Sequence, residues 1–249
     1  MIIPVDTLII IACMFLAAGT IKGLIGIGLP TIAISMMSLV VDARLAITLT
    51  IIPMFVSNLW QVYRIGVIWA TFLKYKVFSA LLIISILISA LSSKTIPSDI
   101  ILIILGPVIT VYAILSLLKW TPYIDKKHDN YAQTSFGLIA GILGGFTAIW
   151  APPMIIYLTS RQTPKEDFIR ATGMLITIGS IPLLAGYIQN GLLTKDMAIS
   201  STLMIIPVLI GFAIGESLRR YVPAQKFLTI VLCIFTVMGI TLIYRGFVN

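Results

Sequence analysis

Apolar stretches of about twenty residues follow one another along almost the whole chain, and only short polar segments separate them. A helix needs about 20 apolar residues to cross a bilayer core of about 30 Å. Of the 249 residues, 59% are apolar and only 10% are charged, which is too few charges to cover the surface of a soluble domain. The sequence therefore predicts an all-α polytopic membrane protein that forms a single membrane domain.

Six of these stretches predict uninterrupted spanning helices, at 43–63, 76–92, 100–118, 168–189, 197–218 and 227–244. Two others, 5–41 and 133–159, contain glycine and proline in their middle, at 22–30 and 144–153. Glycine weakens a helix and proline suits its first turn, so each stretch predicts two helices joined by a turn. The second stretch allows arms of only about 11–13 residues, too short to cross the membrane. We therefore expect two re-entrant hairpins.

The distribution of basic residues favours this topology. If both broken stretches return to their own side, twelve of the seventeen Lys and Arg residues lie on one side and four on the other, with Lys22 in neither group. Positively charged residues gather in cytoplasmic loops. We therefore expect both termini outside, and the loops 64–76, 119–132, 161–167 and 219–226 in the cytoplasm.

Four matches at offsets of 122 to 126 residues indicate an internal repeat: Pro30 with Pro152, Ala46 with Ala171, Gly66 with Gly191, and Pro97 with Pro223. The predicted division is a first repeat at 1–118, a cytoplasmic linker at 119–132 and a second repeat at 133–249. Each repeat is a broken hairpin followed by three spanning helices. Three crossings per repeat turn the second copy upside down, giving the inverted-topology repeats that are common in secondary transporters.

The two hairpin turns are the best candidates for a binding site. The second arm of each hairpin starts within the membrane, where its unpaired N–H groups and the positive end of its dipole favour an anion. We expect Gly26 and Gly28 in one turn, and Gly145 and Thr147 in the other, to present backbone N–H groups to a substrate. The alternative is that these glycines only allow helices to pack closely.

Five further polar or aromatic residues are candidates. Lys22 is the only charged residue far from a segment end, and it could neutralise an anion or bond to carbonyl groups of the turn. Asn58 and Gln61 share one face of the next helix, with Thr50 nearby, and they could contact substrate oxygens or link helices. Trp150 could gate the second turn or pack against it.

Several classes of function find little support. All nine carboxylate residues lie near segment ends or in loops, whereas a cation transporter or a proton relay would usually place one at the midplane. The single histidine, His128, lies in the linker without a partner for a metal site or a nucleophile. The net charge of +8 comes from short loops, with no basic helix for nucleic acid. We expect no catalytic residue, no cofactor and no metal.

Segments spread over nearly the whole chain resemble the sulfite exporter TauE/SafE family. The first half matches it at 23–30 (GLIGIGLP), 42–50 (DARLAITLT) and 58–66 (NLWQVYRIG), and the second half at 137–153, 171–173, 187–191 and 215–223. The resemblance implies export of a small sulfur-containing or organic anion, such as sulfite or sulfoacetate, across a bacterial cytoplasmic membrane. Thr147, Ala148 and Trp150 stand where the family usually has small residues, which implies an altered pocket.

The leading hypothesis is secondary export of a small anion by alternating access, with one repeat rocking against the other around the hairpin turns. The alternatives are an anion channel of the same architecture, a membrane-embedded enzyme, and a scaffold without transport. For the enzyme, the sequence offers no polar catalytic cluster. The expected partners are the anion and the lipid bilayer, and a proton that accompanies the anion is left open.

Overall fold

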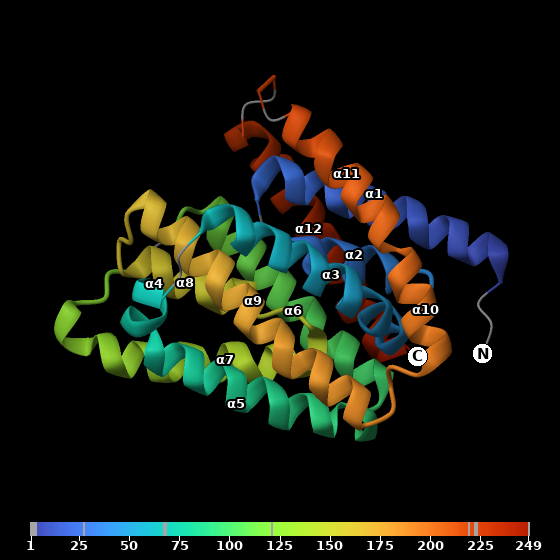
Figure 1. Cartoon of the computed structure of the whole chain (residues 1–249), viewed down its shortest axis with the longest axis horizontal. Helices are drawn as coiled ribbons and strands as arrows, with labels where there is room; N and C mark the ends of the chain where they lie inside the picture. Colours follow the sequence, from blue (N-terminus) through green and yellow to red (C-terminus); the bar gives the residue numbers. More distant parts are fainter. Residues whose placement is uncertain are drawn as a thin grey trace. The chain divides into compact units, whose positions relative to one another are not determined.

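The computed structural model describes residues 4–26, 28–66, 69–120, 122–218, 220–221 and 224–248 of the chain, and these residues form helices and no strand (Figure 1). The predicted all-α fold is confirmed. The α-helices are α1 (Val5–Ile25), α2 (Leu29–Met37), α3 (Ala43–Ile65), α4 (Trp69–Lys74), α5 (Lys76–Ser92), α6 (Ser98–Leu117), α7 (Asp129–Thr147), α8 (Ala151–Ser160), α9 (Lys165–Gln189), α10 (Lys195–Leu203), α11 (Ile205–Leu218) and α12 (Ala224–Val248). Two short 3-10 helices, η1 (Ser93–Thr95) and η2 (Lys126–His128), precede α6 and α7.

Seven segments in the described part of the chain are long and apolar enough to cross a membrane. Six of them coincide with the predicted spans to within a few residues at each end, and the seventh is α1. The predicted span at 197–218 is interrupted, because α10 ends at Leu203 and α11 begins at Ile205. The predicted loop at 64–76 contains the short helix α4.

Both predicted interruptions are present. α1 ends before Gly26 and α2 begins after Gly28, and these two glycines have φ angles of 92° and 99°, in the region that favours glycine. α7 ends at Thr147 and α8 begins at Ala151, with Ala148 left-handed at a φ of 58°. Proline stands in the first turn of α2 and of α8, where its fixed φ suits a helix start.

The predicted length of about 11–13 residues for the arms of the second hairpin is wrong for the first arm, α7, and close for the second arm, α8, which has 10 residues. α7 has 19 residues, because the helix extends back into the polar segment before residue 133 and begins at Asp129. α1 has 21 residues. At 1.5 Å per residue each of these helices is about 30 Å long, which matches the thickness of a bilayer core. The first arms are therefore long enough to cross the bilayer core, whereas the second arms α2 and α8, with 9 and 10 residues, are too short to do so.

The chain divides into two compact units, and each unit takes helices from both predicted repeats. Unit 1 comprises Met1–Met54, Ile96–Lys119 and Leu193–Asn249, and unit 2 comprises Phe55–Thr95 and Trp120–Leu192. The first half of α3 belongs to unit 1 and its second half to unit 2.

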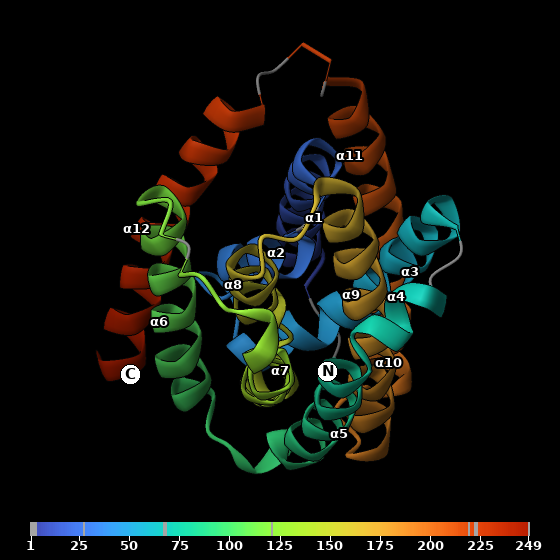
Figure 2. The same ribbon diagram turned by 90° about the vertical axis from the view of Figure 1, so that its left-hand side faces the viewer.

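Two long helix pairs form unit 1. α1 packs along α11, and α6 packs along α12, as Figure 2 shows for the second pair. α2 lies against α1 and α12. Hydrogen bonds from side chains to backbone carbonyls add to this packing. Ser201 Oγ donates to the carbonyl of Leu49 at 2.8 Å, and Arg245 Nη1 donates to the carbonyl of Ser38 at 2.7 Å.

In unit 2, α5 packs against both α7 and α9, and α8 packs against α7 and α9 (Figure 1). The buried Tyr157 of α8 stacks on Phe78 with 5.4 Å between ring centroids, and it meets Tyr75 edge-on at 6.1 Å. These rings hold α8 against the start of α5.

The same pairing of helices occurs twice, and each time it joins one predicted repeat to the other. The first arm of each repeat packs on the second span of the other, α1 on α11 in unit 1 and α7 on α5 in unit 2. Each of these second spans follows a short helix, α10 before α11 and α4 before α5. A two-fold relation between the repeats would produce this exchange, which supports the repeat. The inverted orientation itself stays a prediction.

Candidate functional site

The residues predicted to bind substrate are divided between the two units. Unit 1 contains Lys22, Gly26, Gly28 and Thr50, and unit 2 contains Asn58, Gln61, Gly145, Thr147 and Trp150.

The break in unit 1 places backbone donors at the start of α2. Gly28 is the N-cap residue of α2 and has no side chain that could bond the first turn. Because Pro30 lacks an N–H, the donors of this turn are those of the buried residues Leu29 and Thr31. Gly26 donates its own N–H to the carbonyl of Lys22 at 2.6 Å. The groups suited to an anion at this break are therefore those of α2 rather than that of Gly26.

Lys22 lies in the last turn of α1 and is only 2% exposed. A cation in this turn complements the negative end of the helix dipole. Its neighbour Gly23 approaches α11 so closely that an added Cβ would lie 2.9 Å from the backbone nitrogen of Glu216. The backbone beside Lys22 is thus held by packing, and its position fits both predicted roles, compensation of an anion and bonding within the protein.

Thr50 is fully buried in α3, and its hydroxyl donates to the carbonyl of Ala46 at 2.7 Å. A hydroxyl has one proton and two acceptor positions. Because the proton is already used, Thr50 can accept a hydrogen bond from a ligand but is not available as a donor.

The break in unit 2 is stabilised by its own residues. Thr147 Oγ1 donates to the carbonyl four residues earlier at 2.7 Å and accepts from the N–H of Ile149 at 3.2 Å, so it caps the end of α7. A Cβ at Gly145 would lie 2.7 Å from the carbonyl oxygen of Ile86 and 2.8 Å from the nitrogen of Ala90, both in α5. Capping thus accounts for Thr147, and close helix packing accounts for Gly145.

The start of α8 offers few backbone donors. Its first turn contains Pro152 and Pro153, which leave Ala151 as the only N–H among its first three residues. The N-cap residue Trp150 is 2% exposed, and its Nε1 atom has no hydrogen-bond partner among the described residues. A buried N–H without a partner is unfavourable, so the indole is a donor that an anion at this break would satisfy.

The ring of Trp150 lies between α7 and α9. A Cβ at Gly144 in α7 would lie 3.0 Å from the Cε3 atom of the ring. A Cβ at Gly179 in α9 would lie 2.9 Å from Cε2, the carbon bonded to Nε1. The two glycines make room for the ring and bring its N–H close to the middle of α9.

Asn58 reaches the same part of α9. Its backbone carbonyl oxygen accepts a hydrogen bond from Thr177 Oγ1 at 3.2 Å, and Thr177 lies two residues before Gly179. The side chain of Asn58 is 2% exposed, whereas Gln61, about one turn later in α3, is only partly buried. The structure therefore brings Asn58 and Trp150 to neighbouring positions along the middle of α9.

Sequence reasoning missed this part of α9. Thr177, Gly179 and Ser180 are buried there, and 61% of an 18-residue apolar window within Lys165–Gln189 is buried, compared with 22% of such a window within Lys195–Leu218. The signal was available at 171–180, where six of ten residues are Ala, Gly, Ser or Thr. Small residues are typical of helix interfaces in membranes and are not needed on a face that meets lipid.

None of the carboxylate residues belongs to the middle of α9, whereas the backbone of Glu216 in α11 packs against Gly23, next to Lys22. Each of the nine Asp and Glu residues lies within two residues of a helix end or outside the α-helices. Within the described residues, no group of three His, Cys, Asp or Glu side chains is arranged to hold a metal ion. The indole of Trp150, which lies against the middle of α9, is thus a neutral hydrogen-bond donor.

The family of the chain follows from comparison with known proteins. The family model described as Sulfite exporter TauE/SafE matches residues 10–242. Searches of curated proteins and of solved structures gave no match. The matched residues run from α1 to α12 and include both helix breaks. The chain is therefore a multi-pass membrane transporter and belongs to the sulfite exporter TauE/SafE family.

Proposed function

We propose that the protein is a secondary transporter that exports a small anion by alternating access, with sulfite or a sulfonate such as sulfoacetate as substrate. The family match over residues 10–242 carries this proposal. Two features of the chain support an anion: the uncapped first turn of α2, and the position of all carboxylates near helix ends or in loops.

In unit 2 we assign substrate contacts to Asn58, Gln61 and Trp150. Asn58 and Gln61 provide amide donors for substrate oxygens, and the indole N–H of Trp150 provides a third. Gly145 and Thr147 contribute to the same site by shaping the turn, through the packing and the cap described above.

In unit 1 we assign the substrate contacts to the first turn of α2, which the chain enters through Gly26 and Gly28. Its backbone N–H groups meet the anion, and the ammonium of Lys22 offsets the negative charge. Thr50 acts as an acceptor, which suits a protonated oxygen of the substrate. A proton that travels on the substrate itself would also explain transport without a midplane carboxylate.

The proposal includes an orientation. The chain lies in the cytoplasmic membrane of a bacterium with both termini outside, and the loops 64–76, 119–132, 161–167 and 219–226 face the cytoplasm. The asymmetric distribution of Lys and Arg supports this orientation.

Uptake into inside-out vesicles tests the function. Purified protein is reconstituted, and uptake of sulfite, sulfoacetate, thiosulfate and acetate is measured against empty vesicles. We expect saturable uptake of at least one sulfur oxyanion, and about tenfold slower uptake in Asn58→Ala, because one substrate hydrogen bond is lost. Asn130→Ala removes an exposed amide from α7 and serves as the matched control.

Two results contradict the proposal. If no anion enters the vesicles, export of a small anion is wrong. If anion flux is ohmic and does not saturate, and counterflow is absent, the protein is a channel, and alternating access is wrong.

A further inference from the structure

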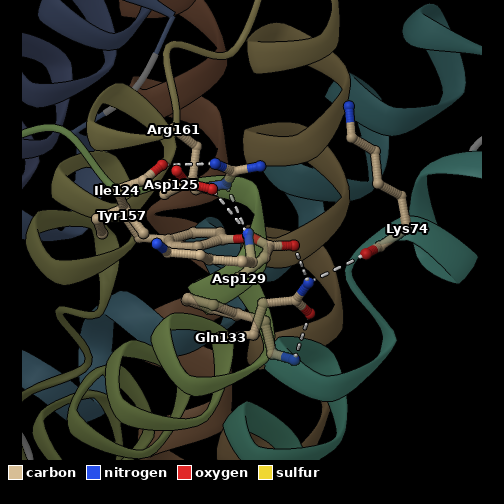
Figure 3. Close-up of polar contacts among 9 residues, drawn as sticks. Lys74, Ile124, Asp125, Asp129, Gln133, Tyr157 and Arg161 are labelled. Carbon is tan, nitrogen blue, oxygen red and sulfur yellow. Dashed lines mark hydrogen bonds and ion pairs between the residues drawn. The ribbon is translucent and has the colours of Figure 1, made fainter.

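A cavity of about 450 Å³ lies at one end of unit 2, away from the breaks (Figure 3). Its walls come from the end of α4, the segment before α7, the starts of α7 and α9, and the end of α8. The candidate spans Lys76–Thr95 and Lys165–Gln189 begin here, so the cavity lies at the level where spanning helices meet the membrane surface. Pockets for organic ligands have volumes of about 300–1,000 Å³.

Charged side chains dominate the lining. Three are cationic, Lys74, Lys126 and Arg161, and two are anionic, Asp129 and Asp167. Each carboxylate already has a cationic partner, since Arg161 Nε lies 2.7 Å from Asp129 Oδ1 and Lys74 Nζ lies 3.0 Å from Asp167 Oδ2. Lys126 is exposed and forms no ion pair with the described residues. The lining therefore has an excess of positive charge.

Lys74 keeps its charge in this setting. Its partial burial alone would lower the pKa, but the hydrogen bond to Asp167 and the nearby Tyr75 and Asp167 together raise it above the ordinary value. A lysine with a raised pKa is protonated throughout the physiological range. Lys74 thus neutralises Asp167 under all conditions in which a cell operates.

Arg161 is fixed before any ligand arrives. Its side chain is 15% exposed, and its Nη1 atom donates to the carbonyl of Ile124 at 2.6 Å. Asp129, its ion-pair partner, is itself held by Tyr157 Oη at 2.9 Å and by Gln133 Nε2 at 3.0 Å. Figure 3 shows the second terminal nitrogen of the guanidinium directed away from Ile124. The contacts of Nε and Nη1 with Asp129 and Ile124 hold the guanidinium in place, which lowers the cost of ordering it for a ligand.

The rest of the lining suits a polar organic group. Tyr75, Tyr123 and Tyr157 line the cavity, and Tyr123 is 67% exposed at its edge. Tyrosine combines an apolar ring with a hydroxyl and is common where a protein meets the membrane surface. The cavity can therefore hold a charged group together with the carbon atoms attached to it.

We propose that this cavity is a second anion site, which binds the oxyanion group of a sulfonate or phosphate through Lys126 and Arg161. The two carboxylates compete with the ligand, so binding is weak and falls as salt rises. Two sources share this chemistry, a soluble organic anion and the head group of an anionic lipid. The proposal does not rest on transport, because binding here is an equilibrium property of unit 2.

Equilibrium titration of the full-length protein tests this site. Protein in nanodiscs of phosphatidylcholine is titrated with sulfate and with sulfoacetate, and the rise in Tm is recorded. A second arm replaces part of the phosphatidylcholine with phosphatidylglycerol and repeats the sulfate titration. Lys126→Gln removes one positive charge from the cavity lining. Lys127→Gln is the matched control, because it removes one positive charge from an exposed neighbour that does not line the cavity.

We expect a saturable rise in Tm with the wild type. The apparent affinity for the anion, taken from this rise, should be about tenfold weaker in Lys126→Gln and unchanged in Lys127→Gln. If phosphatidylglycerol abolishes the sulfate response of the wild type, the lipid head group occupies the site. If the response persists in phosphatidylglycerol, the site takes a soluble anion.

Two outcomes overturn the site. One is equal weakening by Lys126→Gln and Lys127→Gln, which would mean that only net charge matters. The other is the absence of any saturable response in either lipid. Asn58→Ala is included because it should slow transport and should keep the tenfold loss of affinity that Lys126→Gln causes in the same background, so that failure of the second site and failure of the proposed function can be told apart.

Discussion

Trp150 is the residue whose surroundings are most informative. Its indole is almost completely buried, and its N–H has no hydrogen-bond partner in the described part of the chain. A buried donor without a partner costs about 1–3 kcal/mol. The ring itself is tightly held between Gly144 and Gly179. Packing between the two glycines explains the position of the ring, and a bound ligand would explain why the buried N–H has no partner within the described residues.

Two substitutions separate these roles. Trp150→Phe keeps most of the ring and removes the N–H, so we expect a stability change within about 1 kcal/mol, because the smaller ring and the lost unsatisfied donor offset each other. Transport should fall about tenfold if the N–H contacts the substrate. Trp150→Ala leaves a cavity and should cost about 3–5 kcal/mol.

The measurements are chemical unfolding in detergent and uptake into vesicles. Normal uptake by Trp150→Phe would show that the indole N–H does not contact the substrate, and would leave Trp150 with a packing role alone.

At the scale of helices, neighbouring helices pack closely at glycine residues. Glycine lies at the contact in the pairs α1–α11, α5–α7 and α6–α12, where an added Cβ would meet backbone atoms of the partner helix. Small residues allow this approach, and in lipid the dispersion attraction between closely packed helices is a principal source of their association. Glycines in these pairs are therefore structural, in contrast to Gly26, which has no atom within 4 Å of an added Cβ.

Gly145→Ala should destabilise the protein by about 1–3 kcal/mol, because the new methyl group would overlap backbone atoms of α5. The atom closest to it is Cβ of Ser89. Ser89→Gly should therefore recover part of this loss in the double variant, as measured by unfolding. Ser92→Gly, exposed on the same helix, gives the intrinsic cost of glycine in α5. Strict additivity of the two substitutions would contradict the proposed contact.

The base of the broken pair α7–α8 is held by the ion pair of Asp129 with Arg161. A double-mutant cycle with Asp129→Asn and Arg161→Gln should give a coupling energy of about 1–2 kcal/mol, because both side chains are largely shielded from water, at 28% and 15% exposure. The pair Lys74–Asp167, with side chains 53% and 46% exposed, is the matched control and should couple by less than about 1 kcal/mol. Equal couplings would show that burial does not strengthen the first pair.

At the scale of the whole molecule, helix length and charge distribution both bear on the path of the chain across the membrane. α1 and α7 are each about 30 Å long, so their lengths allow a full crossing. The charge count favours a return of each broken pair to its own side. A chemical label can decide between these paths.

Both native cysteines, Cys13 and Cys233, are free and exposed, so they are first replaced by serine. In that background, a cysteine introduced by Lys127→Cys should resist a membrane-impermeant maleimide in intact cells, because the segment 119–132 is predicted to be cytoplasmic. Lys165→Cys lies on the far side of the broken stretch 133–159 and is also predicted to be cytoplasmic, so it should resist the label as well. Lys94→Cys, in a segment predicted to be outside, should be labelled. The opposite pattern at all three positions would reverse the orientation, and labelling of only one of positions 127 and 165 would overturn the hairpin topology.

Much of the fold could be predicted because lipid imposes a simple rule on the chain. Every backbone polar group in the membrane must be bonded within its own segment, so apolar length translates directly into helices such as α5 and α9. The breaks were also predictable, since Gly26, Gly28 and the prolines of α8 have local conformational preferences. The start of α7 was not, because a polar segment can extend a helix beyond its apolar part.

The candidate site could be predicted only in part. Local sequence identifies residues that can bind an anion, but it does not show whether their hydrogen bonds are already used. The structure shows that Thr50 and Thr147 donate to their own helices, that Gly145 packs on α5, and that Trp150 keeps a buried donor.

The sequence alone determined that this chain is an all-α membrane protein with two broken helices, because hydrophobic length and the preferences of glycine and proline act within a few residues. Only the tertiary structure decided which helices pair, that each compact unit takes helices from both predicted repeats, and that Trp150 and Asn58 lie along the middle of α9. Such contacts join residues far apart in the chain, and they depend on the fit of complete helix surfaces rather than on any local preference.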